Sequence, residues 1–486
     1  MTASAPGARS PFPFQHLFPP PIRRKPMSDG LKPTPTAGRL AELKQISQHA
    51  GVVLVGQLAV MAFGVTDTVV AGRYSETALA ALSVGSAVYI SVYVGLMGII
   101  QALLPVWAEL HGGQRQGEVG PSVRQALYLC VLTIFVGMVV LLSPGPMLRA
   151  TGVPAELQVE ASRYLAILAW ALPPALLFRL FSTLNQSLGQ PRLVSSLQIG
   201  ALLPKILLSI WFTFGGAGLA PQGAAGCAWA TLLVNYALLV VAVYLLRKQR
   251  LYRPYGIWSR MERPDWSQIA RFARLGIPAG LAVMVEVTSF TLMALFIARL
   301  GTLAAASHQI ASNVAAILYM VPLALGIAAS ARVSFWLGAG DEMKARRAAF
   351  LGIWVAGAIA LCLATGVALL ARPLAALYVD QPAIIAMTSG LLTLVALYHL
   401  GDAIQAVSVF VLRSYRMVLA PLLIYCLFLW GLGLVGGYYL AFNGLGPWSA
   451  MSAPSAFWMA SAGATALVAT IFLGLLRRVT QRSVRA

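Results

Sequence analysis

The chain has 486 residues, of which 59% are hydrophobic and only 10% are charged, whereas about 25% are charged in an average globular protein. A water-soluble fold of this composition cannot cover its own surface with polar atoms, so the sequence predicts that most of the chain lies in lipid. The formal net charge of +20 does not indicate a nucleic-acid partner, because Lys and Arg gather in the cytoplasmic loops of membrane proteins.

The first 45 residues differ from the rest of the chain. They contain nine prolines and seven basic residues among Ser, Thr and Gly, without a helical period. Such a segment cannot bury enough apolar surface to offset the entropy lost on ordering. Residues 1–45 are therefore predicted to be a disordered, Pro-rich cytoplasmic tail.

Twelve apolar runs follow this tail, each long enough to cross a bilayer, which takes about 20 residues. None alternates like a barrel strand, so every span is predicted to be an α-helix. Six spans make an N-lobe (46–246) and six a C-lobe (275–476), joined by a basic cytoplasmic linker (247–274) and followed by a basic cytoplasmic tail (477–486). The predicted spans are 50–71, 79–107, 125–144, 164–184, 193–213, 224–246, 275–299, 303–336, 347–371, 387–411, 418–441 and 456–476.

Basic residues are distributed unevenly between the two sets of loops. The even-numbered loops and both tails contain most of them, including the run from Arg247 to Arg274. The odd-numbered loops contain only Arg73, Arg149, Arg163, Arg299 and Arg372. Because basic residues stay on the cytoplasmic side, we expect a multi-pass protein of the cell inner membrane with both termini in the cytoplasm.

The two halves of the chain repeat each other. Residues 79–83 (LAALS) are similar to 303–307 (LAAAS), and 107–113 (WAELHGG) are similar to 335–340 (FWLGAG). Since each half has an even number of spans, both halves enter the membrane in the same sense. The repeat predicts two pseudo-symmetric six-helix lobes about an axis along the membrane normal, which is typical of transporters.

Three acidic residues lie within predicted spans: Asp67, Glu286 and Asp402. A charged side chain at the centre of a membrane helix costs roughly 2.5–3.5 kcal/mol, so each acid must face protein or water. Such an acid can simply tie two helices together, but three in a duplicated bundle favour an ion or proton pathway. Glu286 and Asp402 lie near mid-depth on antiparallel helices of one lobe, where one pocket can hold both and bind Na⁺ or a proton.

The motifs around these acids resemble those of the multidrug and toxic compound extrusion (MATE) family, in its NorM-type branch. They are VTDTVVAG (65–72), LAALSVGS (79–86), EVTSF (286–290), SHQIASN (307–313), DAIQ (402–405) and LRSY (412–415). The resemblance implies a V-shaped bundle of two six-helix lobes that exports organic cations in exchange for Na⁺ or H⁺. It places Glu286 and Asp402 in the C-lobe cation site and Asp67 in the N-lobe. His308 and Asn313 are supporting candidates, although His308 alone is typical of a hydrogen-bonded packing residue.

Lys205 departs from the family pattern, because relatives have Asn at the matching position of the fifth span. Asp67 should lie about 6 Å below the outer end of its span and the Lys205 backbone about 12 Å below the end of its own. A Lys side chain extends far enough to close that difference. We therefore predict that Lys205 pairs with Asp67 and replaces a bound cation, which leaves coupling to the C-lobe. The alternative is that Lys205 faces a water-filled cavity and repels cationic substrates.

The sequence thus predicts an all-α, monomeric antiporter that exports amphipathic, cationic organic compounds by alternating access. Its partners are a small-molecule substrate and membrane lipid, and it needs no cofactor apart from Na⁺ or H⁺ as coupling ion. A flippase for lipid-linked substrates is an alternative, but away from the span ends the predicted spans offer a pyrophosphate only three basic residues, Arg179, Lys205 and Arg332. A polytopic membrane enzyme would need a catalytic cluster near one interface, and the sequence contains none.

Overall fold

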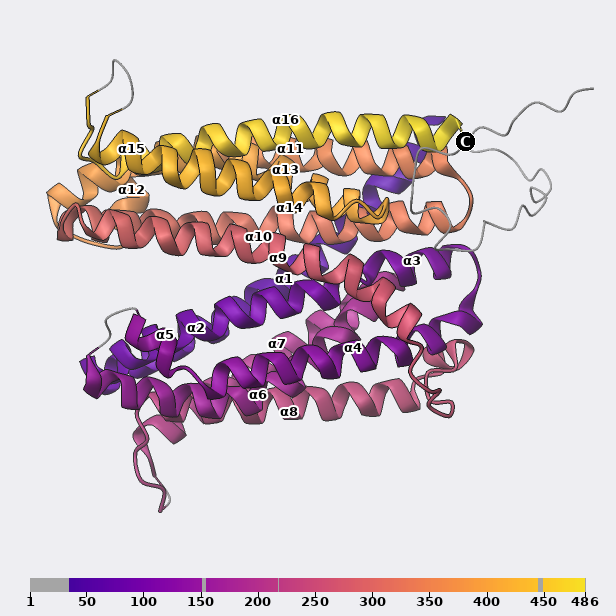
Figure 1. Cartoon of the computed structure of the whole chain (residues 1–486), viewed down its shortest axis with the longest axis horizontal. Helices are drawn as coiled ribbons and strands as arrows, with labels where there is room; N and C mark the ends of the chain where they lie inside the picture. Colours follow the sequence, from indigo (N-terminus) through magenta and orange to yellow (C-terminus); the bar gives the residue numbers. More distant parts are fainter. Residues whose placement is uncertain (1–34, 151–153, 217, 445–448, 486) are drawn as a thin grey trace, which may run out of the picture.

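The computed structural model describes residues 35–150, 154–216, 218–444 and 449–485, and they form a helical bundle (Figure 1). In these ranges the only β-structure is a single bridge between Gly216 and Leu219. Twelve helical segments are long and apolar enough to cross a membrane, which confirms the predicted all-α class and the number of spans.

The N-lobe is built around α6, which packs against α2, α4 and α8, while α1 packs against α7. Pro105 stands at the start of α3, where the second span breaks into α2 and α3. The helices are α1 (Pro35–Tyr74), α2 (Glu76–Gln101), α3 (Leu104–Gly112), α4 (Gln116–Leu142), α5 (Gly145–Ala150), α6 (Ala155–Ser187), α7 (Pro191–Phe214) and α8 (Ala224–Lys248).

The C-lobe is built around α13, which packs against α10, α11 and α16. Its eleventh span contains a π-helical stretch, η3, in which Gly433 lies against Ala464 and Ser461 of α16. The elements are α9 (Trp266–Ala298), α10 (Thr302–Gly338), α11 (Glu342–Leu369), α12 (Ala371–Ala376), α13 (Pro382–Ser414), α14 (Leu419–Tyr425), η3 (Cys426–Gly436), α15 (Gly437–Phe442) and α16 (Ser455–Arg485).

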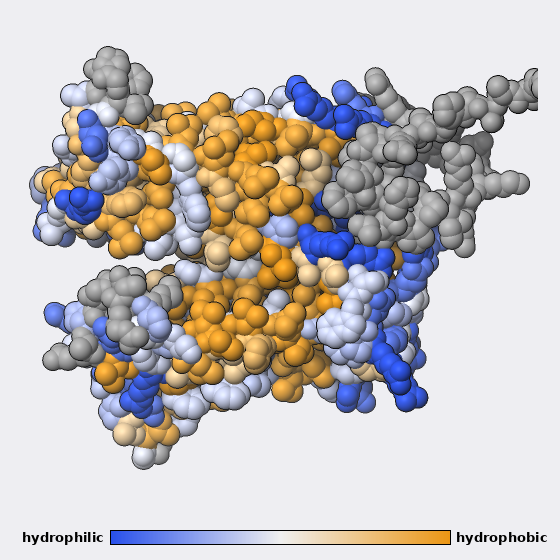
Figure 2. Space-filling model, viewed as in Figure 1, coloured by the Kyte–Doolittle hydropathy of each residue, from blue (hydrophilic) through white to orange (hydrophobic). Residues whose placement is uncertain are grey.

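The two lobes meet at one end of the molecule and separate at the other (Figure 1). They meet where α3, the interlobe segment with η2 (Arg250–Tyr255) and the C-terminal end of α16 lie; we call this the linker end. At the opposite end, near α5 and α12, the space-filling view shows a groove between them (Figure 2). On the visible face, hydrophobic residues cover the middle of the molecule and hydrophilic residues cluster at both ends, as expected for a bilayer-spanning protein.

The N-terminal part of the first helix of each lobe packs into the core of the other lobe. Ile46 and Val53 of α1 belong to the buried cluster around α10, α13 and α16 in the C-lobe. Phe272 and Leu275 of α9 belong to the cluster around α4 and α6 in the N-lobe. This reciprocal crossing lies at the linker end and connects the lobes there through apolar packing.

Two boundaries differ from those expected from the sequence. Helix α1 already begins at Pro35, so the last eleven residues of the segment 1–45 are helical and not disordered; residues 1–34 lie outside the described residues. The reason is local, because α1 contains no further proline after Pro35 and continues with good helix formers such as Leu40, Ala41 and Glu42.

The segment predicted as a linker, 247–274, is largely structured. Helix α9 begins at Trp266. Its N-cap is Asp265, whose Oδ1 accepts hydrogen bonds from the backbone amides of Ser267 and Gln268. Before it, Arg124 of α4 binds the Glu262 carboxylate and donates to the Gly256 carbonyl at 2.6 Å. The interlobe segment is therefore docked on the N-lobe.

Candidate functional site

The two C-lobe acids are buried on neighbouring helices and bound by neutral donors. Glu286 of α9 is 9% exposed and Asp402 of α13 is 2% exposed. The Tyr319 hydroxyl donates to Glu286 Oε2 at 3.3 Å. Asp402 Oδ1 accepts from the Tyr398 hydroxyl at 3.3 Å and from Gln405 Nε2 at 3.0 Å. Within the described ranges no basic side chain forms an ion pair with either acid, and the hydrogen-bond donors that reach them are neutral.

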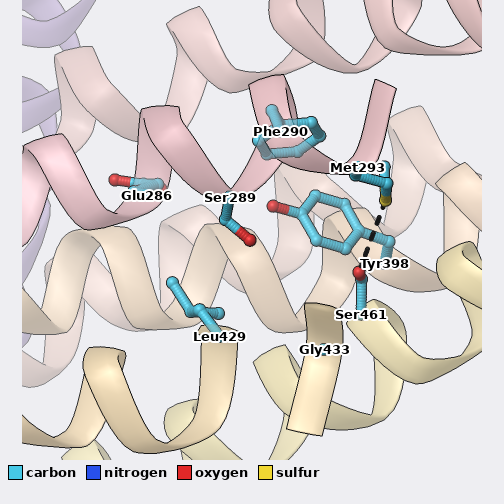
Figure 3. Close-up of a pocket in the computed structure, with 8 residues that line it drawn as sticks. All are labelled: Glu286, Ser289, Phe290, Met293, Tyr398, Leu429, Gly433 and Ser461. Atoms are coloured by element: carbon cyan, nitrogen blue, oxygen red, sulfur yellow. Dashed lines mark hydrogen bonds between the residues drawn. The ribbon is translucent and has the colours of Figure 1, made fainter. Parts of the chain in front are cut away.

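A cavity in the C-lobe is bordered by Glu286 (Figure 3). Glu286 lies in its wall, whereas Asp402 lies behind Tyr398, whose ring lines the cavity and whose hydroxyl binds Asp402. Of the two acids predicted to share one pocket, only Glu286 lines this cavity, and Tyr398 connects the cavity to Asp402. Four helical elements, α9, α13, η3 and α16, supply the lining: Glu286, Ser289, Phe290, Met293, Tyr398, Leu429, Gly433 and Ser461.

His308 is buried in an aromatic cluster beside this cavity. Its Nδ1 accepts from Trp458 Nε1 at 3.3 Å, and its Nε2 hydrogen-bonds with the Ser312 hydroxyl at 3.2 Å. Trp458 in turn packs edge-on against Tyr398, with ring centroids 5.7 Å apart. Both ring nitrogens of His308 thus form hydrogen bonds away from the acids. His308 is connected to Asp402 only indirectly, through Trp458 and Tyr398.

Asn313 is not brought to the acids. It is exposed on α10, and its side-chain oxygen accepts from Gln309 Nε2 at 3.2 Å. Tyr319 and Tyr398, which do bind the acids, were not identified from the sequence. For Tyr398 a signal existed, because it precedes Asp402 by four residues and so shares its helix face.

The N-lobe acid is held differently, by a lysine. Lys205 Nζ of α7 lies 2.6 Å from Asp67 Oδ1 of α1, so the structure contains the pair predicted from helix depth. The ammonium also donates to Thr231 Oγ1 at 2.7 Å and to the Cys227 carbonyl at 3.1 Å, which provides an acceptor for each of its three protons. The Ser209 hydroxyl donates to Asp67 Oδ1 at 3.0 Å.

Burial makes this pair a closed unit. Lys205 is fully buried and Asp67 is 8% exposed, so Lys205 does not face an open cavity as the alternative required. Ser209 follows Lys205 by four residues, so helical spacing was a usable signal for it. Thr231 comes from α8, and its part in the pair depends on packing that no local pattern reveals.

The oxygen-rich C-lobe site suits a hard cation or a proton. No group of three or more His, Cys, Asp or Glu side chains gathers anywhere in the described part of the chain. Around the cavity the available oxygen ligands are the Glu286 carboxylate and the hydroxyls of Ser289, Tyr398 and Ser461, and the Asp402 carboxylate is hydrogen-bonded to Tyr398 behind them. Oxygen donors of this kind match Na⁺ or H⁺ better than a transition metal, which prefers nitrogen or sulfur.

Fold and site together define a class: two-lobed, polytopic helical membrane proteins with ionisable groups buried inside their spans. The profile of the MatE family matches residues 53–211 and 278–439, one segment in each lobe. The chain belongs to the MatE family.

Similar proteins cover nearly the whole chain. It is 37% identical over 440 residues to the probable multidrug resistance protein NorM of Aromatoleum aromaticum, covering 90% of this chain and 94% of that one. It is 34% identical over 409 residues to the multidrug resistance protein PmpM of Pseudomonas aeruginosa, covering 84% and 85% of the two chains.

Solved structures share the fold. The eukaryotic MATE transporter AtDTX14 superposes with a TM-score of 0.81 at 19% identity, over 92% of this chain and 100% of that one. The bent form of the Vibrio cholerae MATE transporter VcmN superposes with a TM-score of 0.79 at 17% identity, over 92% and 99% of the two chains. The predicted MATE fold is therefore confirmed.

Proposed function

We propose that the protein is a secondary transporter that exports amphipathic, cationic organic compounds in exchange for Na⁺ or H⁺ by alternating access. The observation that carries this proposal is the position of Glu286, a membrane-embedded carboxylate in the wall of a cavity and without a basic partner in the described ion pairs. Relatives named as multidrug resistance proteins support a role in the efflux of drug-like compounds.

The chemistry of the C-lobe site explains how it can couple to an ion gradient. Two buried carboxylates with only neutral donors are costly while charged, so a proton or a cation that enters the cavity is strongly stabilised there. Binding of the ion changes the relative stability of the two lobe arrangements, and an ion gradient can then drive the exchange. Glu286 would contact the ion directly, while Tyr398 would orient Asp402 towards it.

The N-lobe takes no part in ion exchange under this proposal. Lys205 already occupies the position of a cation at Asp67 and is held by two further acceptors, the Cys227 carbonyl and Thr231 Oγ1. Moving it away would leave two unpaired charges in the interior, which is strongly unfavourable. The pair therefore stays closed while the C-lobe loads and releases its ion.

The proposal includes orientation and assembly. The linker end, which contains the arginine-rich interlobe segment, would face the cytoplasm of a cell with both termini on that side of its inner membrane. The groove near α5 and α12 would then face outwards. The cavity and both acid sites lie within one chain, so a monomer suffices.

A flippase for lipid-linked pyrophosphates is less well supported by the contacts. Lys205 is paired with Asp67, and Arg332 is paired with Glu42 at 2.7 Å. Arg179 and Arg413 each retain buried N–H groups without a hydrogen-bond acceptor in the described part of the chain, but they lie on α6 and α13 of different lobes. A diphosphate needs several basic groups converging on one place, which this distribution does not provide.

Counter-flux in proteoliposomes tests the proposal. Vesicles containing the purified protein and a fluorescent organic cation are placed under a Na⁺ gradient or a pH gradient, and efflux is followed by fluorescence. We expect one of the two gradients to drive efflux in the parental protein. Replacing Glu286→Gln should reduce driven efflux by at least about tenfold, because the amide keeps the shape but removes the charge that binds the ion.

The matched control is Glu76→Gln, which removes an exposed carboxylate from the first turn of α2. It should leave driven efflux at the parental rate. The proposal is wrong if Glu286→Gln and Asp402→Asn, each at normal abundance, still export at that rate under either gradient.

A further inference from the structure

The lobes touch through their backbones at the linker end. Gly112 ends α3 in the N-lobe, and a Cβ atom built there would lie 1.9 Å from the Phe335 carbonyl oxygen of α10. The contact is reciprocal, because a Cβ atom on Gly338 of α10 would lie 1.9 Å from the Glu109 carbonyl oxygen of α3. Real Cβ atoms do not approach oxygen so closely, so only glycine allows the two helix ends to cross here.

This crossing joins the two copies of the internal repeat. Gly112 belongs to residues 107–113 and Gly338 to residues 335–340, the segments whose sequences match between the halves. Each glycine lies against the backbone of the other copy, so the pseudo-twofold relation between the lobes passes through this contact. The two glycines can stay this close to the opposite backbone only while the lobes keep one relative orientation.

An ion pair between the lobes lies beside the glycines. Arg416, just after α13, donates from Nη2 to Glu109 Oε2 of α3 at 2.5 Å. Arg416 has a φ of +62°, a left-handed conformation that is uncommon for a residue with a side chain. The turn is closed by the Met417 amide, which donates to the Leu412 carbonyl at 3.0 Å. The strained turn thus places the Arg416 side chain on the N-lobe.

We propose that these contacts form a linker-end latch, consisting of Glu109, Gly112, Phe335, Gly338 and Arg416, which holds the lobes in the arrangement that is open near α5 and α12. The latch must release before the space between the lobes can open at the linker end. The inference rests on the alternating-access function proposed above. It adds the contacts that set the relative stability of the arrangement open near α5 and α12 and the arrangement open at the linker end.

The latch can be weakened and restored by charge. Glu109→Arg or Arg416→Glu places like charges face to face, whereas the combined variant Glu109→Arg/Arg416→Glu recreates the pair with its polarity reversed. An ion pair of this exposure, 24% for Arg416 and 38% for Glu109, changes a two-state ratio by about two- to fivefold when lost. Gly338→Ala should act more strongly, by roughly tenfold or more, because the added methyl group collides with backbone and not with a flexible side chain.

The direct readout is the distance between the lobes at the linker end. Spin labels on Arg192→Cys at the start of α7 and Met343→Cys at the start of α11, both exposed positions, report it in a chain with Cys362 and Cys426 replaced by serine. We expect Glu109→Arg and Gly338→Ala to increase the population with the longer separation and the charge-swapped pair to return it to the parental value. The control Glu118→Gln removes an ion pair with Arg115 inside one lobe, and it should leave the distances unchanged.

The proposal is overturned if Glu109→Arg, Arg416→Glu and Gly338→Ala all keep the parental distances, or if the charge-swapped pair behaves like the two single variants. These distances are measured without substrate or ion gradient. A protein that does not exchange cations can therefore still show the latch, and a transporter without the latch can still exchange them, so the two proposals fail separately.

Discussion

The N-lobe and the C-lobe bury their acids in opposite ways. Asp67 lies 2.6 Å from a lysine ammonium that is itself saturated with acceptors, and the pair is sealed inside the lobe. Glu286 and Asp402 receive hydrogen bonds only from neutral groups in the described contacts, and Glu286 borders a cavity. On a duplicated scaffold, one basic residue therefore distinguishes an acid held in an ion pair from two acids that have no such pair in the described ranges, which are the acids proposed to exchange an ion.

The energetic consequence differs between the lobes. In the N-lobe, Coulomb attraction and hydrogen bonds offset the desolvation of two charges, and the result is a fixed neutral unit. In the C-lobe, no ion pair among the described residues offsets the desolvation of the two carboxylates, and under the proposed function a bound ion would do so. Stability should therefore depend most on Lys205, and transport most on the C-lobe acids.

The largest effect on stability is expected from removing the lysine. Lys205→Ala leaves the Asp67 carboxylate buried without its partner, which costs about 3–5 kcal/mol. Adding Asp67→Asn to Lys205→Ala removes the orphaned charge and should recover most of that loss. Thermal unfolding of the purified variants in detergent measures both effects.

A matched control for this cycle is Asp67→Asn alone, which orphans the ammonium instead of the carboxylate. If Lys205→Ala is as stable as Lys205→Ala/Asp67→Asn, the two residues do not act as a pair in the folded protein, and the contrast between the lobes disappears.

Ser289 offers a way to make the C-lobe resemble the N-lobe. It lines the cavity and follows Glu286 by three residues on α9, so a lysine at this position can reach the carboxylate. Ser289→Lys should reduce gradient-driven efflux by at least about tenfold. This reduction is expected if the lysine ammonium binds at Glu286 more favourably than the mobile ion by about 1.4 kcal/mol. Efflux from proteoliposomes measures it.

Ser289→Met is the control, since it adds comparable length without the charge. It should retain more efflux than Ser289→Lys. An equal loss of efflux in both variants would mean that the cavity cannot accept a longer side chain. The charge of the lysine would then not be the cause.

The fold and the main acids were predictable because they depend on properties that are local in sequence. Twelve spans follow from the length of apolar runs, and a carboxylate inside such a run stands out because so few exist. Even the contact between Lys205 and Asp67 followed from helix rise, since both residues lie at computable depths. The depth of a residue along a span can be counted from the sequence, whereas the neighbouring helix that each face contacts is harder to predict.

The features that were missed depend on packing between distant segments. Glu42 looked like part of a polar tail, yet it binds Arg332 and Trp336 on α10, almost three hundred residues later. Tyr319 is one of sixteen tyrosines, and only its position on α10 distinguishes it as a partner of Glu286. The docking of residues near 262 on α4 was hidden for the same reason, because an arginine-rich segment ordinarily indicates a solvated loop.

The tyrosines that bind the C-lobe acids should have moderate effects. Tyr319→Phe removes the donor to Glu286 and Tyr398→Phe removes a donor to Asp402. A hydrogen bond contributes about 0.5–1.5 kcal/mol, so each variant should change the apparent affinity for the coupling ion by roughly 2- to 10-fold. The ion concentration that gives half-maximal efflux measures this change. Tyr439→Phe, at an exposed position, should not change it, and an equal change there would indicate a general effect on folding.

The smallest effect is expected in the segment between the lobes, which is docked on the N-lobe. The Arg124 guanidinium beside Glu262 lowers the pKa of that carboxyl below its ordinary value, chiefly through their hydrogen bonds. A carboxyl whose pKa is lowered by folding stabilises the docked segment above its unfolded pKa, about 4.3. The contribution is lost as the pH falls through the lower, folded value. Docking should therefore be constant from about pH 5 to 8 and weaken below about pH 4.

Hydrogen exchange of the amides in residues 249–265, corrected for the intrinsic effect of pH, measures this docking. We expect protection to fall by less than about fivefold in acid, because the Glu262 side chain is 42% exposed and such pairs contribute little. Contacts that do not involve the Glu262 carboxylate persist at low pH; among them, the Tyr128 hydroxyl donates to the Glu262 carbonyl at 2.8 Å, and Gln125 Nε2 donates to the Arg263 carbonyl at 2.9 Å. Glu262→Gln should show the reduced protection at every pH. If its protection still falls in acid as in the parental chain, another group controls the docking, and the segment is not held to the N-lobe by this carboxylate.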